Sequence, residues 1–99
     1  MTITKQSSGG SLTLALEGRL DTGTAPQLEA ELNASLGGVT ELTLDMARLQ
    51  YVSSAGLRVV LAAQKQMNRQ GHMTVRHVCA DIMEVFEMTG FVDILDIEN

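Results

Sequence analysis

Two adjacent serines, Ser53 and Ser54, carry hydroxyl groups that could bind an anion or act as nucleophiles. They belong to residues 45–57, which connect an alternating apolar segment to the most apolar helix that the pattern predicts. Ala55 and Gly56 follow them, and residues this small leave both hydroxyls accessible. In an open α/β sheet, a connection of this kind presents the unpaired N–H groups of the helix to an anion. Serine is also a preferred N-cap residue, and from the residues alone this purely structural role is favoured.

Catalysis by a serine nucleophile would need a general base within hydrogen-bond reach and donors for an oxyanion. The chain has no Gly-x-Ser-x-Gly elbow, and its only histidines, His72 and His77, are expected on or beside a strand as surface or edge residues. Cys79, the only cysteine, is expected to be a small buried hydrophobe. One Cys and two His along a strand do not converge as zinc ligands do, and there is no Gly-rich phosphate loop. We expect no enzymatic activity, no metal and no cofactor.

Charge and composition narrow the range of partners. The 99 residues include 7 basic and 12 acidic side chains, and the formal net charge of −5 repels nucleic acid and anionic lipid headgroups. A single cysteine allows no intramolecular disulfide and gives no sign of an oxidising compartment. Residues 1–6 lack a basic region and an apolar run, and the longest apolar stretch, residues 59–63, is too short to span a bilayer. We expect a cytoplasmic protein without membrane insertion or nucleic-acid binding.

Apolar alternation and helical spacing define the first half of the chain. Apolar side chains at every second position predict a strand over residues 11–17. The small residues 8–10 before it are typical of a hairpin turn, which makes residues 2–6 an antiparallel first strand. Thr24 and Gln27 form a capping-box pattern for a helix that continues to the glycine pair after its last leucine.

The second half of the chain predicts a strand, helix, strand unit. Residues 42–45 alternate as a central strand, and a loop through Gln50 leads to a helix over residues 57–67. This helix is apolar on most sides at its start, so it must be buried against a sheet. Residues 72–78 return as a strand, and this order implies a right-handed parallel crossover. The last expected elements are a third helix, beginning near Asp81 with Glu84 fitting its cap and ending at Gly90, and an edge strand over residues 94–97.

Several segments together resemble the landmarks of the STAS domain, the family of bacterial anti-sigma factor antagonists. They occur in the family's order and cover nearly the whole chain: Gly18-Arg-Leu-Asp21 followed by Thr24-Ala25, the strand at residues 42–45, Tyr51-Val-Ser-Ser-Ala-Gly-Leu57, and Phe86-Glu-Met-Thr-Gly-Phe91. Four landmarks at consistent spacing are more specific than any one short motif. The resemblance implies a single STAS domain over residues 1–99, of α/β class, with a central mixed sheet of four to five strands packed with about three to four helices.

The resemblance also implies a phosphorylation site. In STAS antagonists the residue two positions before the loop glycine accepts phosphate from a partner anti-sigma factor, and that residue is Ser54 here. Many antagonists carry Asp before the acceptor and Ser or Thr after it, whereas this chain has Ser53 and Ala55, so Ser53 is the alternative acceptor and the two serines could exchange roles. Asp21 matches an acidic position beside the phosphorylated serine, and its alternative role is that of a solvated turn residue. The implied switch loop comprises Asp21, Tyr51, Ser53, Ser54, Ala55, Gly56 and Leu57.

By the same resemblance, the chain is expected to be an anti-sigma factor antagonist that regulates transcription as a phosphoprotein. Its unphosphorylated form would bind an anti-sigma factor, itself a serine kinase, and a serine phosphatase would reset it. The alternative is a constitutive STAS interaction subunit of a transporter or lipid-trafficking complex, which is not phosphorylated. Exposed Met46, Met83 or Met88 could form part of a docking patch, although core packing is the expectation for each of them.

Overall fold

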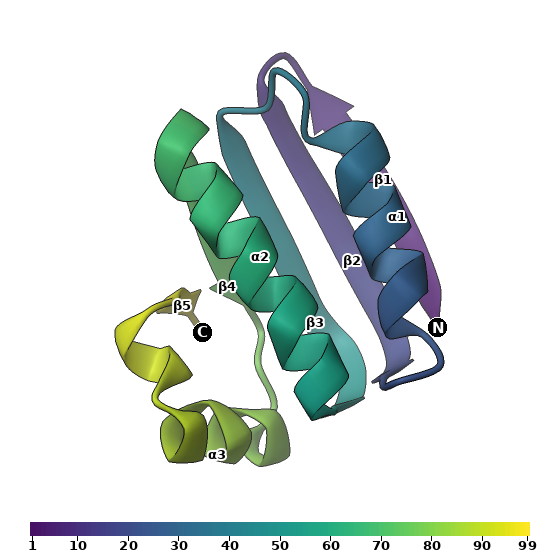
Figure 1. Ribbon diagram of the computed structural model, residues 1–99, viewed down its shortest axis with the longest axis vertical. Helices are drawn as coiled ribbons and strands as arrows, with labels where there is room; N and C mark the ends of the chain where they lie inside the picture. The colour runs from purple at the N-terminus through teal and green to yellow at the C-terminus, as the bar shows by residue number, and fades with distance from the viewer.

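The sheet has five strands and is mixed, as expected from the sequence. The computed structural model describes residues 1–99, and its strands are ordered β1-β2-β3-β4-β5. β1 is antiparallel to β2, and the other neighbouring strands are parallel. The elements, shown in Figure 1, are β1 (Thr2–Ser8), β2 (Ser11–Leu20), α1 (Ala25–Ser35), β3 (Glu41–Val52), α2 (Ser54–Gln70), β4 (His72–Arg76), α3 (Ala80–Thr89), the 3-10 turn η1 (Phe91–Asp93) and β5 (Asp96–Glu98).

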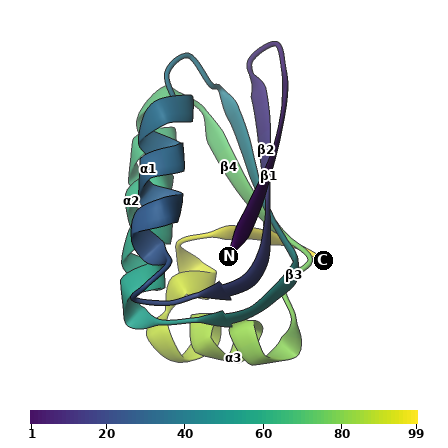
Figure 2. The same cartoon turned by 90° about the vertical axis from the view of Figure 1, so that its right-hand side faces the viewer.

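The helices lie on one side of the sheet and at one of its ends. Figure 2 shows α1 and α2 against the same face of the sheet, with α3 below the end at which β3 finishes. The opposite face carries no helix. Parallel pairing aligns Leu20 at the end of β2 with Val52 at the end of β3. Both strands therefore deliver their following loops to the same end of the molecule.

One cluster of 25 buried apolar side chains forms the core. The alternating leucines of β2 point into it, and Phe86 of α3 closes it with no exposed surface. The start of α2 is buried against the sheet on one face, through Leu57 and Val60, while Arg58 between them is exposed. None of the helices combines the length and apolar character that crossing a membrane would take.

The central strand is longer than the alternation predicted. β3 continues through residues 46–50, which were expected to form a loop, and ends only at Val52. Its pairing with β2 shifts register twice, first between Ala15 and Glu17 and again between Gly18 and Arg19. An extra residue in one strand breaks the period of two without ending the ladder. The sequence therefore loses its strand pattern although the strand itself persists.

Neither predicted side-chain cap forms. At the start of α1 the Thr24 hydroxyl donates to the Arg19 carbonyl at 2.7 Å and accepts from the Asp21 N–H at 2.9 Å, so it is occupied in the preceding turn. At the start of α3 the N-cap residue is Cys79, and Asp81 lies inside the first turn instead of capping with Glu84. The loop before each helix sets the positions of the Thr24 hydroxyl and the Asp81 carboxyl. The local sequence does not specify the shape of that loop.

Other boundaries and burials also differ from expectation. α2 begins at Ser54 and not at residue 57. β4 stops at Arg76, two residues early, because His77 takes up a left-handed backbone with φ of 59°. The edge strand β5 covers residues 96–98, where 94–97 was expected. Cys79 is only half-buried. Of the three methionines considered for a docking patch, Met88 is exposed, Met83 is half-buried and Met46 is completely buried.

Candidate functional site

The junction between β3 and α2 holds Ser53 as a helix cap. Ser53 has extended backbone angles, φ of −90° and ψ of 174°, and its hydroxyl oxygen accepts from the Gly56 N–H at 3.2 Å. Its carbonyl accepts the first helical hydrogen bond, from the Leu57 N–H at 2.9 Å. The side chain of Ser53 is thus engaged in starting the helix, which is the structural role that serine commonly has at this position.

Ser54 is the first residue of α2, and its side chain is exposed. Its hydroxyl makes no hydrogen bond within the protein, in contrast to that of Ser53. The first turn of α2 carries no acidic side chain, so nothing there offsets the partial positive charge of the helix N-terminus. The Ser53 hydroxyl is therefore hydrogen-bonded, whereas the neighbouring Ser54 hydroxyl is exposed and makes no hydrogen bond.

Gly56 brings the start of α2 unusually close to the end of β2. A Cβ atom on Gly56 would lie 2.7 Å from Leu20 Cγ and 2.9 Å from the Leu20 carbonyl oxygen. The same carbonyl accepts a hydrogen bond from the Ser53 N–H at 2.9 Å. Because Asp21 directly follows Leu20, this contact brings the loop after β2 beside the loop after β3. The two segments that the resemblance assigned to one switch loop therefore meet at this point.

Asp21 organises the turn into α1. Its Oδ1 accepts from the N–H groups of Gly23 at 3.0 Å and Thr24 at 3.1 Å, and from the Thr24 hydroxyl at 3.2 Å. Desolvation alone would raise the pKa of Asp21, but these donors and the nearby Arg19 guanidinium outweigh it and hold the pKa below its usual 3.8. No hydrogen bond joins Asp21 to Ser54. The Asp21 carboxylate therefore stays ionised, and the hydrogen bonds that it accepts stabilise the turn between β2 and α1, which adjoins Ser53.

Tyr51 and Arg19 form a pair on the surface of the same end of the sheet. The Arg19 guanidinium carbon lies 4.2 Å from the centre of the Tyr51 ring, and the two residues are directly opposite in the β2–β3 ladder. Tyr51 remains 40% exposed. Such a cation–π contact keeps a large aromatic surface in a fixed orientation beside the junction. Sequence reasoning identified Tyr51 but missed Arg19, because the pairing depends on a register between distant strands.

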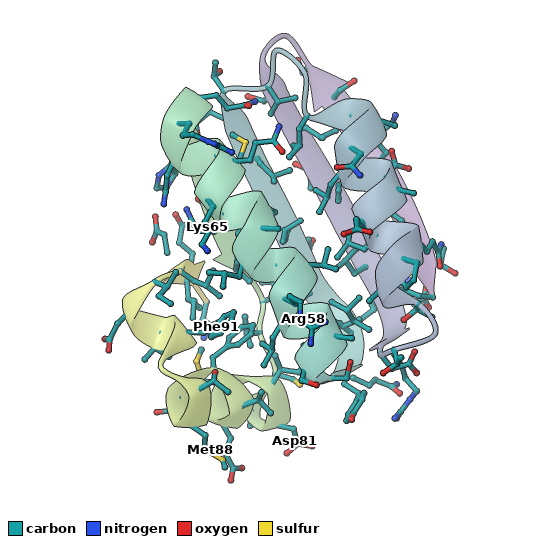
Figure 3. The ribbon with its side chains drawn as sticks, in the orientation of Figure 1. Arg58, Lys65, Asp81, Met88 and Phe91 are labelled. Carbon is teal, nitrogen blue, oxygen red and sulfur yellow. The ribbon has the colours of Figure 1, made fainter.

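Arg58 is a second residue that the sequence reasoning missed. It lies four positions after Ser54, which places both on one face of α2. Figure 3 shows Arg58 projecting outward from that helix. It borders a groove of about 250 Å³ between α1 and α2, which Ala55 and Pro26 also line. The spacing of four from a candidate acceptor serine is the signal that would have identified it.

The remaining polar residues considered from the sequence lie away from this junction. His72 pairs with Asp96 at 2.8 Å and His77 with Asp45 at 3.0 Å, and both histidines are exposed, as expected. Neither histidine is hydrogen-bonded to Ser53 or Ser54. No group of three or more His, Cys, Asp or Glu side chains is arranged to hold a metal ion. The Ser54 hydroxyl of the junction is exposed and is not hydrogen-bonded to either histidine.

Known proteins resemble the chain over most of its length. Residues 3–96 match the family model described as "Mlab, STAS domain". A protein of Bordetella bronchiseptica that bears the name anti-sigma factor antagonist BtrV is 41% identical over 101 residues, which cover 100% of this chain and 87% of that protein. The anti-sigma-B factor antagonist of Listeria monocytogenes is 27% identical over 97 residues, covering 96% of this chain and 85% of the relative.

Solved structures share the fold. The anti-sigma factor antagonist SpoIIAA in its unphosphorylated form superposes with a TM-score of 0.79 at 18% identity, covering 99% of this chain and 88% of SpoIIAA. An anti-sigma factor antagonist from Mycobacterium paratuberculosis gives a TM-score of 0.88 at 20% identity, covering 97% of this chain and 83% of that one. At these identities the likeness concerns the α/β fold, with its five-stranded mixed sheet and three α-helices.

Proposed function

The chain belongs to the STAS domain family, and we propose that it works as an anti-sigma factor antagonist, a protein-binding domain that regulates transcription. Its unphosphorylated form binds an anti-sigma factor, and phosphorylation of Ser54 releases that partner. The name of the relative that is 41% identical over the whole chain supports the general role. One observation carries the switch: the Ser53 hydroxyl is used as the helix cap, whereas the neighbouring Ser54 hydroxyl is exposed and unbonded.

Ser54 is the proposed acceptor, and Ser53 is the positioning residue beside it. Phosphorylating Ser53 would modify the oxygen that accepts the hydrogen bond from the Gly56 N–H and would disturb the first turn of α2. Phosphorylating Ser54 breaks no hydrogen bond, because its hydroxyl makes none. Many antagonists carry Asp directly before the acceptor. Ser53 can replace that Asp here, since a serine side chain also provides an N-cap oxygen.

The fold is expected to tolerate a phosphate on Ser54. The group adds about −1.5 to −2 units of charge at neutral pH. It would sit at the positive end of the α2 dipole, in a first turn that contains no acidic side chain. Arg58, one turn further along the same face, supplies a positive charge at the i,i+4 spacing that stabilises helical ion pairs. The modification therefore changes the surface of the domain and leaves its core intact.

A partner docked over the junction would not tolerate the phosphate. Burying a dianion without a matched partner, or placing it against like charge, costs several kcal/mol. Since about 1.4 kcal/mol corresponds to a tenfold change in affinity, the loss is roughly a hundredfold or more. Tyr51 with Arg19, the exposed Ser54 and the loop at Asp21 together provide the surface that such a partner covers.

The proposed partners are an anti-sigma factor that is also the serine kinase, and a serine phosphatase that resets the switch. Residues 1–99 are proposed to act as a single STAS domain, which the one cluster of buried apolar residues supports. The proposed role is binding and not catalysis, which the regulatory name of the relative that is 41% identical supports. We propose a cytoplasmic location, where an antagonist would meet its anti-sigma factor.

Binding and phosphorylation test this proposal together. The protein partner is the anti-sigma factor kinase encoded nearest to the gene of this chain, measured by calorimetry with wild type, Ser54→Ala and Ser54→Asp. Ser54→Ala should bind as wild type does but should gain no mass when incubated with the kinase and ATP. Ser54→Asp should bind roughly a hundredfold more weakly, as estimated for charge burial.

Two controls make the outcome decisive. Asn68→Asp adds the same charge at an exposed position near the far end of α2 and should leave binding unchanged. Intact-mass analysis of the wild type should show one added phosphate. Equal affinities for wild type and Ser54→Asp, with no added mass, would instead favour the constitutive subunit of a transporter or lipid-trafficking complex.

A further inference from the structure

The acidic side chains are unevenly distributed along the chain. Residues 81–99 contain six of the twelve acidic residues and none of the seven basic ones. This segment comprises most of α3 together with η1 and β5. It alone accounts for the negative net charge, because the seven basic residues elsewhere slightly outnumber the six acidic ones. The domain therefore has one strongly negative region at α3 and η1.

The same segment contains most of the large apolar surface that is exposed. Of the four large hydrophobic residues that the structure exposes, three lie here: Met88 at 79%, Val92 at 37% and Ile94 at 47% exposed. The rings of Phe86 and Phe91 stack with centroids 6.2 Å apart, which fastens η1 to α3 on the buried side. That anchoring holds Val92 outward. We call the exposed residues Met88, Val92 and Ile94 the α3 patch.

Four of the six carboxylates in this segment have no cationic partner within the chain. Asp96 and Glu98 of β5 pair with His72 and Arg76, respectively. The other four acidic residues of the segment form no ion pair and are exposed. They are Asp81, Glu84, Glu87 and Asp93.

Helical spacing puts two of these acids on the same side of α3 as the exposed methionine. Asp81, Glu84 and Met88 follow at i, i+3 and i+7, which places them along one face. Figure 3 shows Asp81 and Met88 on the outer side of α3, directed away from the sheet, while Phe91 points inward. One face of α3 thus carries the exposed Met88 side chain and two carboxylates without a cationic partner.

We propose that the α3 patch is a docking surface for a basic amphipathic helix of a partner protein. Apolar side chains of such a helix would cover Met88, Val92 and Ile94, and Lys or Arg residues beside them would meet the free carboxylates. Methionine is unbranched and flexible, which suits it to receive an apolar helix face. This inference concerns a surface separate from Ser54 and goes beyond the proposed switch.

Charge complementarity selects this occupant over others. A second copy of the chain would bring the same four carboxylates against one another, and like charges oppose such pairing. Nucleic acid and anionic membranes are repelled for the same reason. α3 lies at the end of the molecule where α2 begins, as Figures 1 and 2 both show, so a partner at the junction could extend onto this helix.

A pair of synthetic peptides tests the proposal without the kinase or the anti-sigma factor. The probe is a 14-residue helix-forming peptide of Leu and Lys with one apolar face, and its counterpart carries Glu in place of every Lys. The chain contains six methionines, whose methyl groups report separately in a carbon–proton NMR spectrum. The Lys peptide should shift the Met88 signal most, and the completely buried Met46, Met67 and Met73 should stay unchanged. The Glu peptide should shift none.

Matched double variants then assign the binding to the α3 patch. Glu84→Gln with Glu87→Gln removes two of its carboxylates and should weaken the Lys peptide by about threefold to tenfold, as expected for two exposed ion pairs. Glu29→Gln with Glu41→Gln removes the same charge from exposed, unpaired positions elsewhere and should change the affinity less than twofold. Val92→Ser should also weaken binding.

Three outcomes would overturn the proposal. They are equal binding of both peptides, equal weakening by the two double variants, and a Met88 signal that shifts on concentrating the protein alone, which would identify a second copy as the occupant. Since the assay needs neither phosphorylation nor an anti-sigma factor, its failure would leave the Ser54 switch standing, and failure of the switch would leave the α3 patch standing.

Discussion

Ser53 and Ser54 are identical neighbours with different surroundings, and their substitution should separate the two roles. Ser53→Ala removes the oxygen that accepts from the Gly56 N–H, so it should lower the free energy of unfolding by about 1 kcal/mol. For a domain of this size that corresponds to a Tm lower by about 4–8 °C. Ser54→Ala removes an unbonded exposed hydroxyl and should change stability by less than about 0.5 kcal/mol. Urea unfolding followed by circular dichroism measures both, and equal losses would contradict the assignment of the cap.

Asp45 should make stability depend on acid pH. Partial burial raises the pKa of this carboxyl, but the Ala47 N–H, the His77 ring and Arg76 outweigh it, so the pKa lies below the ordinary 3.8. A carboxyl with a lowered pKa in the folded state stabilises the fold above its unfolded pKa, and that contribution is lost as the pH falls through the folded value. Asp45→Asn should therefore be less stable than wild type at pH 7, with a difference that shrinks below about pH 4.

Urea midpoints between pH 2 and pH 7 test this dependence. The matched control is Asp93→Asn, which removes an exposed carboxylate that makes no ion pair and should give no comparable loss at pH 7. A difference between wild type and Asp45→Asn that stays constant over the whole pH range would show that Asp45 acts through packing and not through its charge.

At the scale of elements, the link from α2 to β4 requires a glycine at position 71, because the backbone of Thr40 packs directly against it. A Cβ atom on Gly71 would lie 2.0 Å from the Thr40 carbonyl oxygen and 2.6 Å from its carbon, and the His72 N–H donates to that same oxygen at 2.9 Å. Backbone at the start of β3 cannot move aside without disturbing the central strand. Gly71→Ala should therefore cost about 1–3 kcal/mol or more. Gly37→Ala, with nothing within 4 Å of its Cβ, should leave stability near wild type in the same unfolding experiment.

Local patterns account for which elements could be predicted. The leucines of β2 alternate and those of α1 recur at helical spacing, so the five strands and three α-helices follow from the sequence, as do the antiparallel first pair and the parallel crossover from β3 to β4. The extension of β3 to Val52 does not, because a register shift against β2 interrupts its alternation. The Thr24 cap fails for a similar reason, since its hydroxyl reaches back to the Arg19 carbonyl in a turn whose shape tertiary packing sets.

The candidate site was predicted in position but not in all its members. The two serines follow from the loop motif, but the sequence leaves open which of them caps the helix, and the hydrogen bond that the Gly56 N–H donates to the Ser53 hydroxyl assigns that role to Ser53. The Arg19–Tyr51 pair joins residues 32 positions apart in the sequence, and only the observed ladder brings them together. The burial of the methionines also depends on the tertiary structure. Met46 is buried and Met88 is exposed, although the residues around them in the sequence do not predict this difference.

At the scale of the whole molecule, one core joins the sheet to all three helices. The 25 buried apolar residues form a single cluster, so no element has a separate core that could unfold independently. Single domains of this size usually unfold in one cooperative step. A phosphate at Ser54 or a partner at the α3 patch should therefore alter the surface while the domain responds to denaturant as one unit.

Leu44→Ala tests this cooperativity from the centre of the core. Leu44 lies in the middle strand of the sheet with no exposed surface, so the truncation should cost about 2–5 kcal/mol, a large part of the about 5–15 kcal/mol by which such domains are stable. Met88→Ala, at a side chain 79% exposed, should change stability by less than about 0.5 kcal/mol. The chain has one tyrosine and no tryptophan, so Tyr51 fluorescence reports on the junction alone while circular dichroism reports on the whole fold. The two signals should give the same urea midpoint in wild type and shift together in Leu44→Ala; an earlier fluorescence transition would mean that the junction unfolds separately from the core.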